Sequence, residues 1–275
     1  MDHVVCLDLD GTLLRPDKTV SDFSVRALQG LYHAGVEIMI ATGRQYRVAK
    51  QLIAALGFDV TIFYANGAAA RTTRRNQKLF NTPVDSDTVQ KIRLLAKEYP
   101  VAGMAHMDYG HDPELYSLSK DGCDVIRDYA CDLGLSVDIL PDHRSTDEAL
   151  SLVFIGALED LFRLEEGIRK SGIPSSFHVM QNAVHVSLLE VMHPNVSKGR
   201  SLIQFLEMRS DENKEVIAIG DDMNDLSLLR AATMGVAMKN AAPNLFEYAD
   251  VVTKYTNAED GVARFLLDHF EHLPE

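Results

Sequence analysis

The chain has 275 residues, of which 46% are hydrophobic and 24% charged, which is the composition of a globular protein with one or two domains. Its net charge of −13, from 40 acidic and 27 basic residues, would repel nucleic acid and anionic lipid, so we expect neither as a partner. No apolar stretch approaches the roughly 20 residues that span a membrane, and the first residues show no secretion signal, so we expect a cytoplasmic protein.

The first third of the chain alternates strand-like and helix-like segments. Apolar runs predict strands and apolar residues at helical spacing predict helices; in chain order the segments are 4–7, 21–32, 36–41, 46–56 and 60–64. Gly57 is a typical residue for the end of the second helix. This order of strands and helices predicts a parallel sheet with helices on both faces.

The middle of the chain has a different pattern. Its helix-like stretches and strand-like pieces are interrupted by polar residues such as 142–147; the helix-like ones are 86–98, 120–133 and 157–171, and the strand-like ones 149–155, 177–180 and 185–189. We therefore predict that residues 83–186 form an α+β domain inserted into a core of residues 1–82 and 187–275.

The last third returns to the first pattern. It predicts helices over 199–208, 224–232 and 261–269 and strands over 216–220, 234–238 and 251–252. The predicted fold class is therefore α/β, with a Rossmann-like, doubly wound parallel sheet as the core and the α+β domain as an insert.

Two aspartates follow the first predicted strand, in the string Asp8-Leu9-Asp10-Gly11-Thr12-Leu13-Leu14. Because side chains of a strand have a period of two, we expect Asp8 and Asp10 to point to the same side. Two carboxylates about 4 Å apart repel by about 4 kcal/mol at an effective dielectric constant of about 20. Mg²⁺, which prefers oxygen ligands, would remove this repulsion. The alternative is an acidic turn after an edge strand.

Polar residues also follow other predicted strands. Open parallel sheets bind ligands at the carboxyl ends of their strands, so these residues are expected to gather there. Thr42 and Gly43 could hold phosphate oxygens where a helix begins, although Thr42 could equally be a helix N-cap. Asn66-Gly67 is first of all a turn signal.

The string Gly220-Asp221-Asp222-Met223-Asn224-Asp225 follows a buried strand. Several carboxylates opposite Asp8 and Asp10 would complete an oxygen-rich magnesium site. Some of them would also cap a helix and interact with its dipole, which is the simpler explanation. Lys198 lies about twenty residues earlier, and a lone lysine carries no signal unless the other motifs are present.

Together these strings resemble the motifs of the haloacid dehalogenase superfamily, whose members mostly hydrolyse phosphate esters through an aspartyl-phosphate. Residues 8–14 resemble its nucleophile motif, Thr42 its second motif, Lys198 its third, and the G-D-x-x-N-D string its metal motif. The T-G-R and N-G-A strings, and an insert between the second and third motifs, resemble the Cof-type, sugar-phosphatase-like subgroup with an α+β cap. One departure is Asn195, where members often have glycine; we expect it to adopt positive φ.

The resemblance implies roles for individual residues. Asp8 would attack phosphorus, and Asp10 would protonate the leaving oxygen and then activate water. Thr42 and Lys198 would neutralise charge on the phosphoryl oxygens. Mg²⁺ would be held by Asp8, Asp10 (through its backbone carbonyl), Asp221 and Asp225, the last of these with Asn224 in a supporting position. Further contacts with phosphate or substrate are implied for Leu9, Gly43, Arg44, Asn66 and Asn224.

The predicted function is a Mg²⁺-dependent phosphatase that acts on a small phosphorylated metabolite. Sugar phosphates are the expected substrates, with flavin mononucleotide or pyridoxal phosphate as alternatives, and candidate specificity residues are His178, Asn182, His185 and Glu190. A phosphomutase or phosphotransferase would use the same aspartate, and a non-catalytic binding protein is a third possibility. A dinucleotide-dependent dehydrogenase would need G-x-G-x-x-G where this chain has D-G-T. The sequence indicates no oligomeric state.

Overall fold

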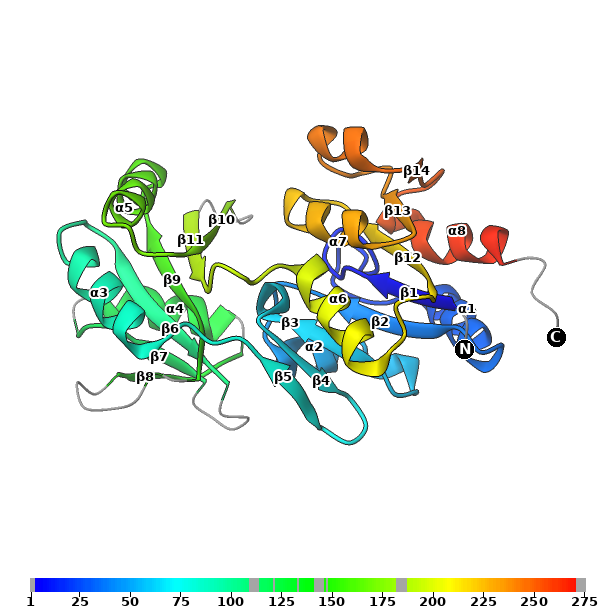
Figure 1. The fold of residues 1–275 in the computed structure, drawn as a ribbon, viewed down its shortest axis with the longest axis horizontal. Coiled ribbons are helices and arrows are strands. Elements are labelled where there is room, and N and C mark those ends of the chain that lie inside the picture. Colours follow the sequence, from blue (N-terminus) through cyan, green and yellow to red (C-terminus); the bar gives the residue numbers. More distant parts are fainter. Residues whose placement is uncertain are drawn as a thin grey trace. The chain divides into compact units, whose positions relative to one another are not determined.

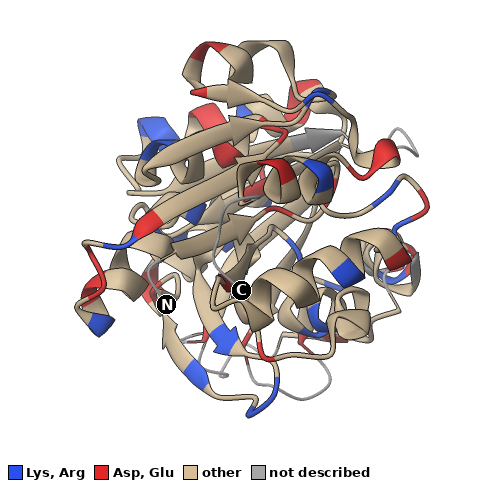
Figure 2. Cartoon of the chain, turned by 90° about the vertical axis from the view of Figure 1, so that its right-hand side faces the viewer, with Lys and Arg blue, Asp and Glu red and all other residues tan. Residues whose placement is uncertain are grey.

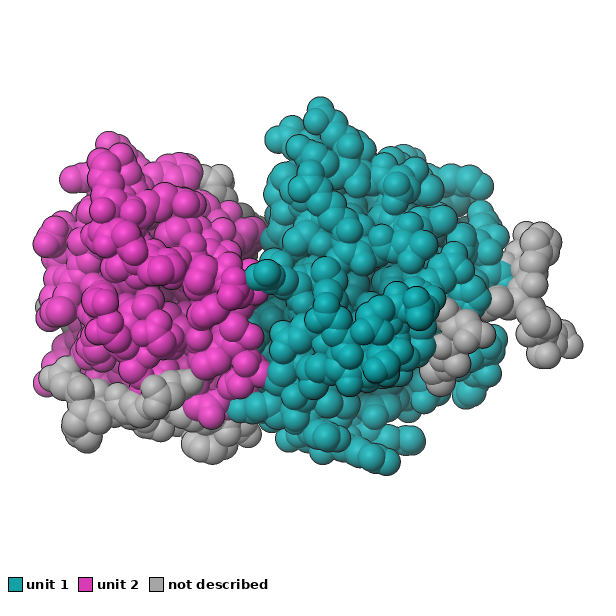
Figure 3. Space-filling model, in the orientation of Figure 1, with its two compact units in different colours: residues 1–80, 197–275 teal, residues 81–196 magenta. Residues whose placement is uncertain are grey.

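The computed structural model describes residues 3–108, 114–120, 122–132, 134–140, 146, 148–181 and 187–270 (Figure 1). Contacts divide the chain into two compact units (Figure 3). The first, here called the core unit, consists of Met1–Phe80 and Ser197–Glu275. The second, here called the inserted unit, consists of Asn81–Val196.

An eight-stranded sheet in the order β14-β13-β12-β1-β2-β3-β4-β5 forms the centre of the core unit. The strands are β1 His3–Leu7, β2 Glu37–Ala41, β3 Thr61–Tyr64, β4 Ala69–Thr72, β5 Lys78–Asn81, β12 Glu215–Gly220, β13 Met234–Ala237 and β14 Val251–Val252. Neighbours from β14 to β3 are parallel, and β4 is antiparallel to β3. The predicted parallel sheet is therefore confirmed. The β4–β5 strands were not predicted, because segments of four residues with polar members show too little alternation.

Helices cover both faces of this sheet. They are α1 Asp22–His33, α2 Tyr46–Leu52, α6 Lys198–Arg209, α7 Leu226–Ala231 and α8 Gly261–His269. Val4 and Cys6 of β1 belong to an apolar cluster with Leu202 of α6 and Leu228 of α7. Helix α1 packs against β2 and α8. Both faces of β1 are buried, as a parallel strand between two helical layers requires.

Short local signals set where several helices begin and end. The hydroxyl of Ser21 accepts the Ser24 N–H at 3.0 Å and starts α1, and Ser197 caps α6 in the same way through Arg200. Helix α2 is followed by a short 3₁₀ turn, Ala54–Leu56, and the chain leaves it at Gly57 with φ of +73°. The predicted helix over 46–56 is thus two shorter segments.

The chain order creates a switch point beside β1. Strands β2 and β3 follow β1 on one side, whereas β12, β13 and β14 extend the sheet on the other side. Ligands of such sheets bind outside the carboxyl ends of the strands where the order reverses. The segments that follow β1, β2, β3 and β12 carry most of the residues predicted to act in the site.

The inserted unit contains a six-stranded sheet in the order β10-β11-β9-β6-β7-β8. Its strands are β6 Ala102–Met107, β7 Leu115–Ser117, β8 Val137–Ile139, β9 Ala149–Gly156, β10 Ser176–Gln181 and β11 Ser187–Met192, and its helices are α3 Ser86–Ala96, α4 Cys123–Asp132 and α5 Leu158–Lys170. Helices α3 and α5 share an apolar cluster with one face, and α4 shares another with the opposite face.

Two details of the insert differ from the sequence analysis. Residues 187–192 were assigned to the core, but as β11 they pair with β9 and β10, which completes the antiparallel part of the inserted unit's sheet. Asn195 was expected at positive φ, but it is not among the described residues with that conformation. Its N–H donates to His193 Nδ1 at 3.2 Å, and this turn needs no left-handed residue.

Charged residues of both signs are distributed over the molecule. Figure 2 shows Lys and Arg among Asp and Glu on helices and loops, so the net charge of −13 does not exclude locally positive regions. In the part of the chain that the structure describes, no helix has the length and apolar character needed to cross a membrane.

Gly199, at the start of α6, lies where α6 and α7 approach closely. A Cβ atom built on Gly199 would collide with the backbone of Ser227 at the edge of α7, whereas one built on Gly30 in α1 meets nothing within 4 Å. We expect Gly199→Ala to lower the free energy of unfolding by about 1–3 kcal/mol, the usual effect of overpacking. Gly30→Ala should raise it by about 0.5–1 kcal/mol through helix propensity. Urea unfolding of both variants checks this, and equal effects would contradict the close approach.

Candidate active site

Asp8 lies directly after β1 and is almost completely buried. Its N–H donates to Ile219 O at 3.0 Å, which continues the pairing of β1 with β12 by one residue. The ammonium group of Lys198, at the first turn of α6, donates to Asp8 Oδ1 at 2.7 Å and to Asp225 Oδ1 at 2.6 Å. These three charged side chains are at most 6% exposed. Residues far apart in sequence therefore form one buried ion cluster.

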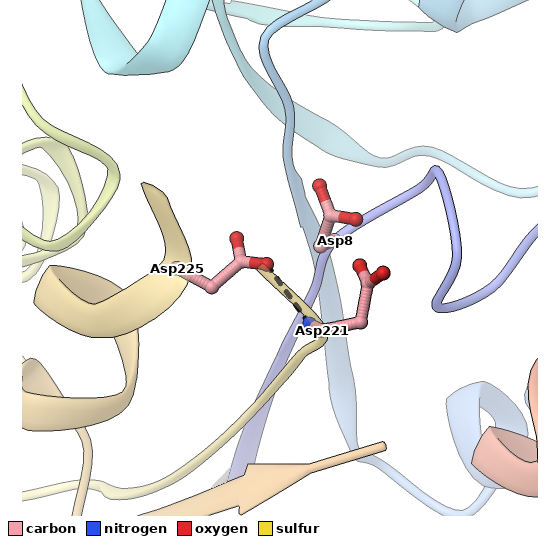
Figure 4. Close-up of side chains that lie close together, drawn as sticks. All are labelled: Asp8, Asp221 and Asp225. Atoms are coloured by element: carbon pink, nitrogen blue, oxygen red, sulfur yellow. Dashed lines mark hydrogen bonds between the residues drawn. The ribbon is translucent and has the colours of Figure 1, made fainter. Parts of the chain in front are cut away.

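The loop after β12 adds a third carboxylate. Asp225 Oδ2 accepts the backbone N–H groups of Asp221 at 3.0 Å and Asp222 at 3.1 Å, which fixes this loop (Figure 4). Thr12 donates its hydroxyl to Asp221 Oδ1 at 3.1 Å. A Cβ atom on Gly11, whose φ is +75°, would collide with the Asp221 carboxylate, so this approach requires glycine.

The carboxylates of Asp8, Asp221 and Asp225 offer oxygen atoms that all lie within 4.8 Å of one another (Figure 4). Three carboxylates and one ammonium group leave a net charge of −2 when all are ionised. Among the described residues, no hydrogen-bond donor contacts Asp8 Oδ2 or Asp221 Oδ2. Carboxylate oxygens are the ligands that hard divalent cations prefer, so these residues fit a metal ion.

Burial and mutual repulsion appear in the proton affinities of the cluster. Burial raises the pKa of Asp8, and Asp225 and Asp221 add to the effect of burial, while Lys198 opposes it. Burial, followed by the charge of Asp225, raises the pKa of Asp221 to about 7. Burial disfavours the charged form of Lys198, but Asp225 and Asp8 outweigh it and raise the Lys198 pKa. The lysine thus stays charged, and the cluster needs further positive charge.

The Asp10 side chain is not part of this cluster. Arg44 donates from Nε to Asp10 Oδ2 at 2.5 Å and from Nη2 to Oδ1 at 2.7 Å, and Lys18 donates to Oδ1 at 2.7 Å. Burial would raise the pKa of Asp10, but the hydrogen bonds and charges of Arg44, and then of Lys18, lower it. The described contacts thus pair Asp10 with Arg44 and Lys18, and Asp8 with Lys198. The expected closeness of the Asp8 and Asp10 carboxylates stays a prediction.

The residues after β2 and β3 form a third group beside the cluster. The Thr42 N–H donates to Phe63 O at 2.8 Å, and the Thr42 hydroxyl accepts the Arg44 N–H at 3.1 Å. Asn224 Nδ2 donates to Asn66 Oδ1 at 3.1 Å, which joins the loops after β12 and β3. A Cβ atom on Gly43 would lie 3.1 Å from the same Asn66 oxygen, so the Gly43 backbone runs close to this amide.

The turn that carries Asn66 has an unusual backbone. Ala65, Asn66 and Gly67 have φ values of +49°, +55° and +91° in succession. A non-glycine residue in the left-handed region costs about 1–2 kcal/mol, and such residues concentrate at functional sites. The Ala65 and Asn66 N–H groups donate to Arg44 O and Thr42 O, each at 3.0 Å. This turn is therefore held against the loop after β2.

The other predicted site residues lie in several parts of the chain. The Leu9 side chain is fully buried, so a phosphate contact from this residue would use its backbone N–H. His178 and Glu190 are register partners in the β10–β11 pair of the inserted unit. Asn182 and His185 lie outside the described residues. Their roles in specificity stay predictions.

Thr12 and Lys18 were not among the predicted site residues. Thr12 belongs to the D-G-T string. It ends the turn that begins at Leu9, and a threonine in such a turn is the signal that could have identified it. Lys18 belongs to no motif, and only the folded loop places it beside Asp10.

Comparisons with known proteins agree over most of the chain. A family model described as haloacid dehalogenase-like hydrolase matches residues 5–266. A Haemophilus influenzae protein is 31% identical over 286 residues, which cover 96% of this chain and 95% of that protein. An Escherichia coli protein named as a pyridoxal phosphate phosphatase is 27% identical, and the match covers 97% of this chain and 98% of that protein.

A solved structure gives the same relation in three dimensions. The crystal structure of a haloacid dehalogenase-like hydrolase from Bacteroides thetaiotaomicron matches with a TM-score of 0.80 at 25% sequence identity. The match covers 98% of this chain and 100% of the Bacteroides chain. The similarity therefore includes both the core unit and the inserted unit.

The buried lysine should dominate the stability of the cluster. We expect Lys198→Met to lower the free energy of unfolding at pH 7 by about 3–5 kcal/mol, because it leaves buried carboxylates without their partner. Lys254→Met is a matched control, since Lys254 pairs with Asp268 at the surface and is 79% exposed. It should change the stability by at most about 1 kcal/mol. Urea unfolding measures both values, and similar effects would contradict the central role of Lys198.

The raised pKa of Asp221 predicts a pH dependence. Its ordinary value is 3.8 and its folded value is about 7, so between these values the folded protein binds more protons than the unfolded chain. Stability from this group is therefore lost as the pH rises from about 4 to about 7. In EDTA, Asp221→Asn should be more stable relative to the wild type at pH 8 than at pH 4. Urea unfolding across this range measures the difference, and a constant difference would contradict it.

Proposed function

Because the chain belongs to the haloacid dehalogenase-like hydrolase family and is a phosphatase of that family, we propose that it hydrolyses small phosphorylated metabolites, sugar phosphates foremost, with Mg²⁺ and through an aspartyl-phosphate on Asp8. One observation carries the proposal. Lys198 donates a hydrogen bond to Asp8 Oδ1, and no donor in the described part of the chain contacts Asp8 Oδ2. Asp8 Oδ2 is therefore left to act as a nucleophile.

The reaction has two half-reactions at phosphorus. In the first, Asp8 Oδ2 forms a bond to phosphorus, the ester P–O bond breaks, and the leaving alkoxide takes a proton from Asp10. In the second, Asp10 accepts a proton from water, the water oxygen bonds to phosphorus, and the Asp8–phosphorus bond breaks. Inorganic phosphate leaves, Asp8 is a carboxylate again, and Asp10 has regained its proton.

Asp8, Asp221 and the backbone carbonyl of Asp10 would hold Mg²⁺, and Asp225 and Asn224 would support them. When bound, the ion supplies positive charge that neutralises both the carboxylate cluster and the phosphoryl oxygens. Asp225 suits a supporting position, because both of its oxygens already accept hydrogen bonds from Lys198 and from the loop after β12.

Other side chains of the site would neutralise the transferring phosphoryl group. Lys198 lies against the nucleophile and carries its charge when buried. The Thr42 hydroxyl, at the end of β2, can donate to a phosphoryl oxygen while it accepts the Arg44 N–H. Backbone N–H groups around Leu9 and Gly43 would add neutral donors. Most of the catalysis of phosphoryl transfer comes from such positioning and charge stabilisation.

The proton on Asp10 depends on the substrate. Arg44 and Lys18 favour its ionised form in the absence of a ligand. The two negative charges of a bound phosphoryl group would repel the Asp10 carboxylate and raise its affinity for a proton, while Arg44 and Lys18 keep their contacts with it. Asp10 would then be protonated when the leaving oxygen needs a proton and ionised when water must be activated.

The inserted unit is the proposed source of specificity. As a cap, the inserted unit of residues 81–196 would exclude water and contact the leaving group. The Escherichia coli relative is named for pyridoxal phosphate, which indicates that small phosphorylated compounds other than sugar phosphates belong in a substrate screen. We also propose a cytoplasmic location, where such metabolites occur.

Phosphate release from a panel of phosphorylated metabolites tests the proposal. We expect turnover with Mg²⁺, its loss in EDTA, and a loss of about 10³-fold or more in Asp8→Asn, because the nucleophile is removed. Asp268→Asn, at a surface ion pair with Lys254, is the matched control and should retain full activity.

Three outcomes would contradict this function. Turnover that persists in a clean preparation of Asp8→Asn excludes Asp8 as the nucleophile. Turnover that is unaffected by EDTA excludes the metal. Transfer of the phosphoryl group to a hydroxyl of the substrate, without phosphate release, would identify a mutase.

A further inference from the structure

A lysine outside all of the recognised motifs contacts the proposed acid–base group. Lys18 Nζ donates to Asp10 Oδ1 at 2.7 Å, and neither the motifs nor the comparisons assign this residue a role. We propose that Lys18 is a positioning residue of the active site, which acts through Asp10 by occupying Oδ1 and leaving Oδ2 as the oxygen that exchanges the proton. This inference rests on the proposed function, which gives Asp10 the two proton transfers.

Lys18 occupies a backbone conformation that a lysine rarely adopts. Its φ is +65°, and its N–H donates to Arg15 O at 2.9 Å. The Arg15 N–H donates to Thr19 O at 2.9 Å, and Asp17 accepts both the N–H and the hydroxyl of Thr19. The left-handed conformation is unfavourable at a non-glycine residue. It persists only where the surroundings fix it, which this closed turn does.

Side chains from the last part of the core unit hold the loop that carries Lys18. The contacts, each 2.7 or 2.8 Å long, are Asn240 Nδ2 to Gly11 O, Asn257 Nδ2 to Leu14 O, and Arg15 Nη2 to Asp260 Oδ2. Asp260 also accepts the hydroxyl of Ser21 at 2.7 Å. The loop is therefore attached on both sides of the turn, and the position of Lys18 follows from the fold.

The two oxygens of Asp10 differ in how many donors they face. Oδ1 accepts from Lys18 Nζ and from Arg44 Nη2, whereas Oδ2 accepts only from Arg44 Nε among the described residues. Each carboxylate oxygen has two lone pairs. Both lone pairs of Oδ1 are used, and one on Oδ2 is left for a proton. Without Lys18, both oxygens would have one open lone pair, and the proton would have two competing positions.

The contact is too exposed to be explained by stability. The Lys18 side chain is 54% exposed and that of Asp10 is 37% exposed. An ion pair in such a position contributes little to stability, no more than the left-handed backbone costs. A structural role therefore does not account for Lys18, whereas fixing the orientation of a reacting carboxylate does.

The proposal is tested by steady-state kinetics of Lys18 variants and the wild type, with Mg²⁺ and the substrate that the wild type hydrolyses best. We expect Lys18→Met to lower kcat by about 10-fold or more, a part of the 10²–10⁴-fold that general acid–base catalysis contributes. KM should change by less than about 2-fold, because substrate binding is not affected. Lys18→Arg should restore most of kcat, and Lys254→Met, at the surface, should match the wild type.

Two further variants separate this role from folding and from other contacts. Lys18→Gly removes the side chain but suits positive φ, so it should keep the melting temperature of the wild type and still lose kcat. In the Asp10→Asn background, the loss from Lys18→Met should be much smaller than in the wild type, because both changes affect one step.

Several results would overturn the proposal. A raised KM with unchanged kcat would make Lys18 a substrate contact. Full additivity with Asp10→Asn would show that it does not act through Asp10. Unchanged kcat in Lys18→Met, with activity lost in Asp8→Asn, would overturn the role of Lys18 and leave the proposed function standing. A wild type that releases no phosphate would overturn both.

Discussion

The contact between one buried ammonium group and two buried carboxylates is the constraint on which the rest of the site depends. Lys198 touches Asp8 and Asp225, and none of the three can be buried alone, because an unpaired charge in a protein interior is very unfavourable. Strand β1, the loop after β12 and the first turn of α6 must therefore meet at one point. The close approach of α6 to α7 at Gly199 is a consequence of that meeting.

Charge in this phosphatase is balanced over short distances. The protein carries −13 overall, and its carboxylate cluster carries −2 when ionised, which a divalent cation would cancel. Next to it, Arg44 and Lys18 exceed the single charge of Asp10 by one. Because salt screens exposed charges beyond about 8 Å, these local groups matter more to a bound phosphoryl group than the net charge does.

The site is built from loops that the rest of the core unit holds in unfavourable conformations. Ala65 and Asn66 after β3, and Lys18 after β1, all have positive φ. Ala65 and Asn66 are fixed by hydrogen bonds to the loop after β2, and Lys18 is fixed within its own closed turn by its N–H bond to Arg15 O. Strain of this kind is compatible with folding because the surrounding sheet is well packed. Its effect is to hold polar groups in place before a substrate arrives, so less reorganisation is needed during the reaction.

The parallel sheet, most helices of the core unit and the strings that carry Asp8, Thr42, Lys198 and Asp221–Asp225 could be predicted from the sequence, because hydrophobic periodicity and strand-end motifs are local patterns. Strands β4 and β5 were missed, because their mixed polar and apolar residues form no apolar run. The pairing of the charged side chains could not be predicted and is seen in the folded chain. Asp8 contacts Lys198, and Asp10 contacts Arg44 and Lys18, which are partners that the strand-end strings do not indicate. Partners 8, 34 and 190 residues apart have no common local signal, and their pairing depends on the distances that the fold creates.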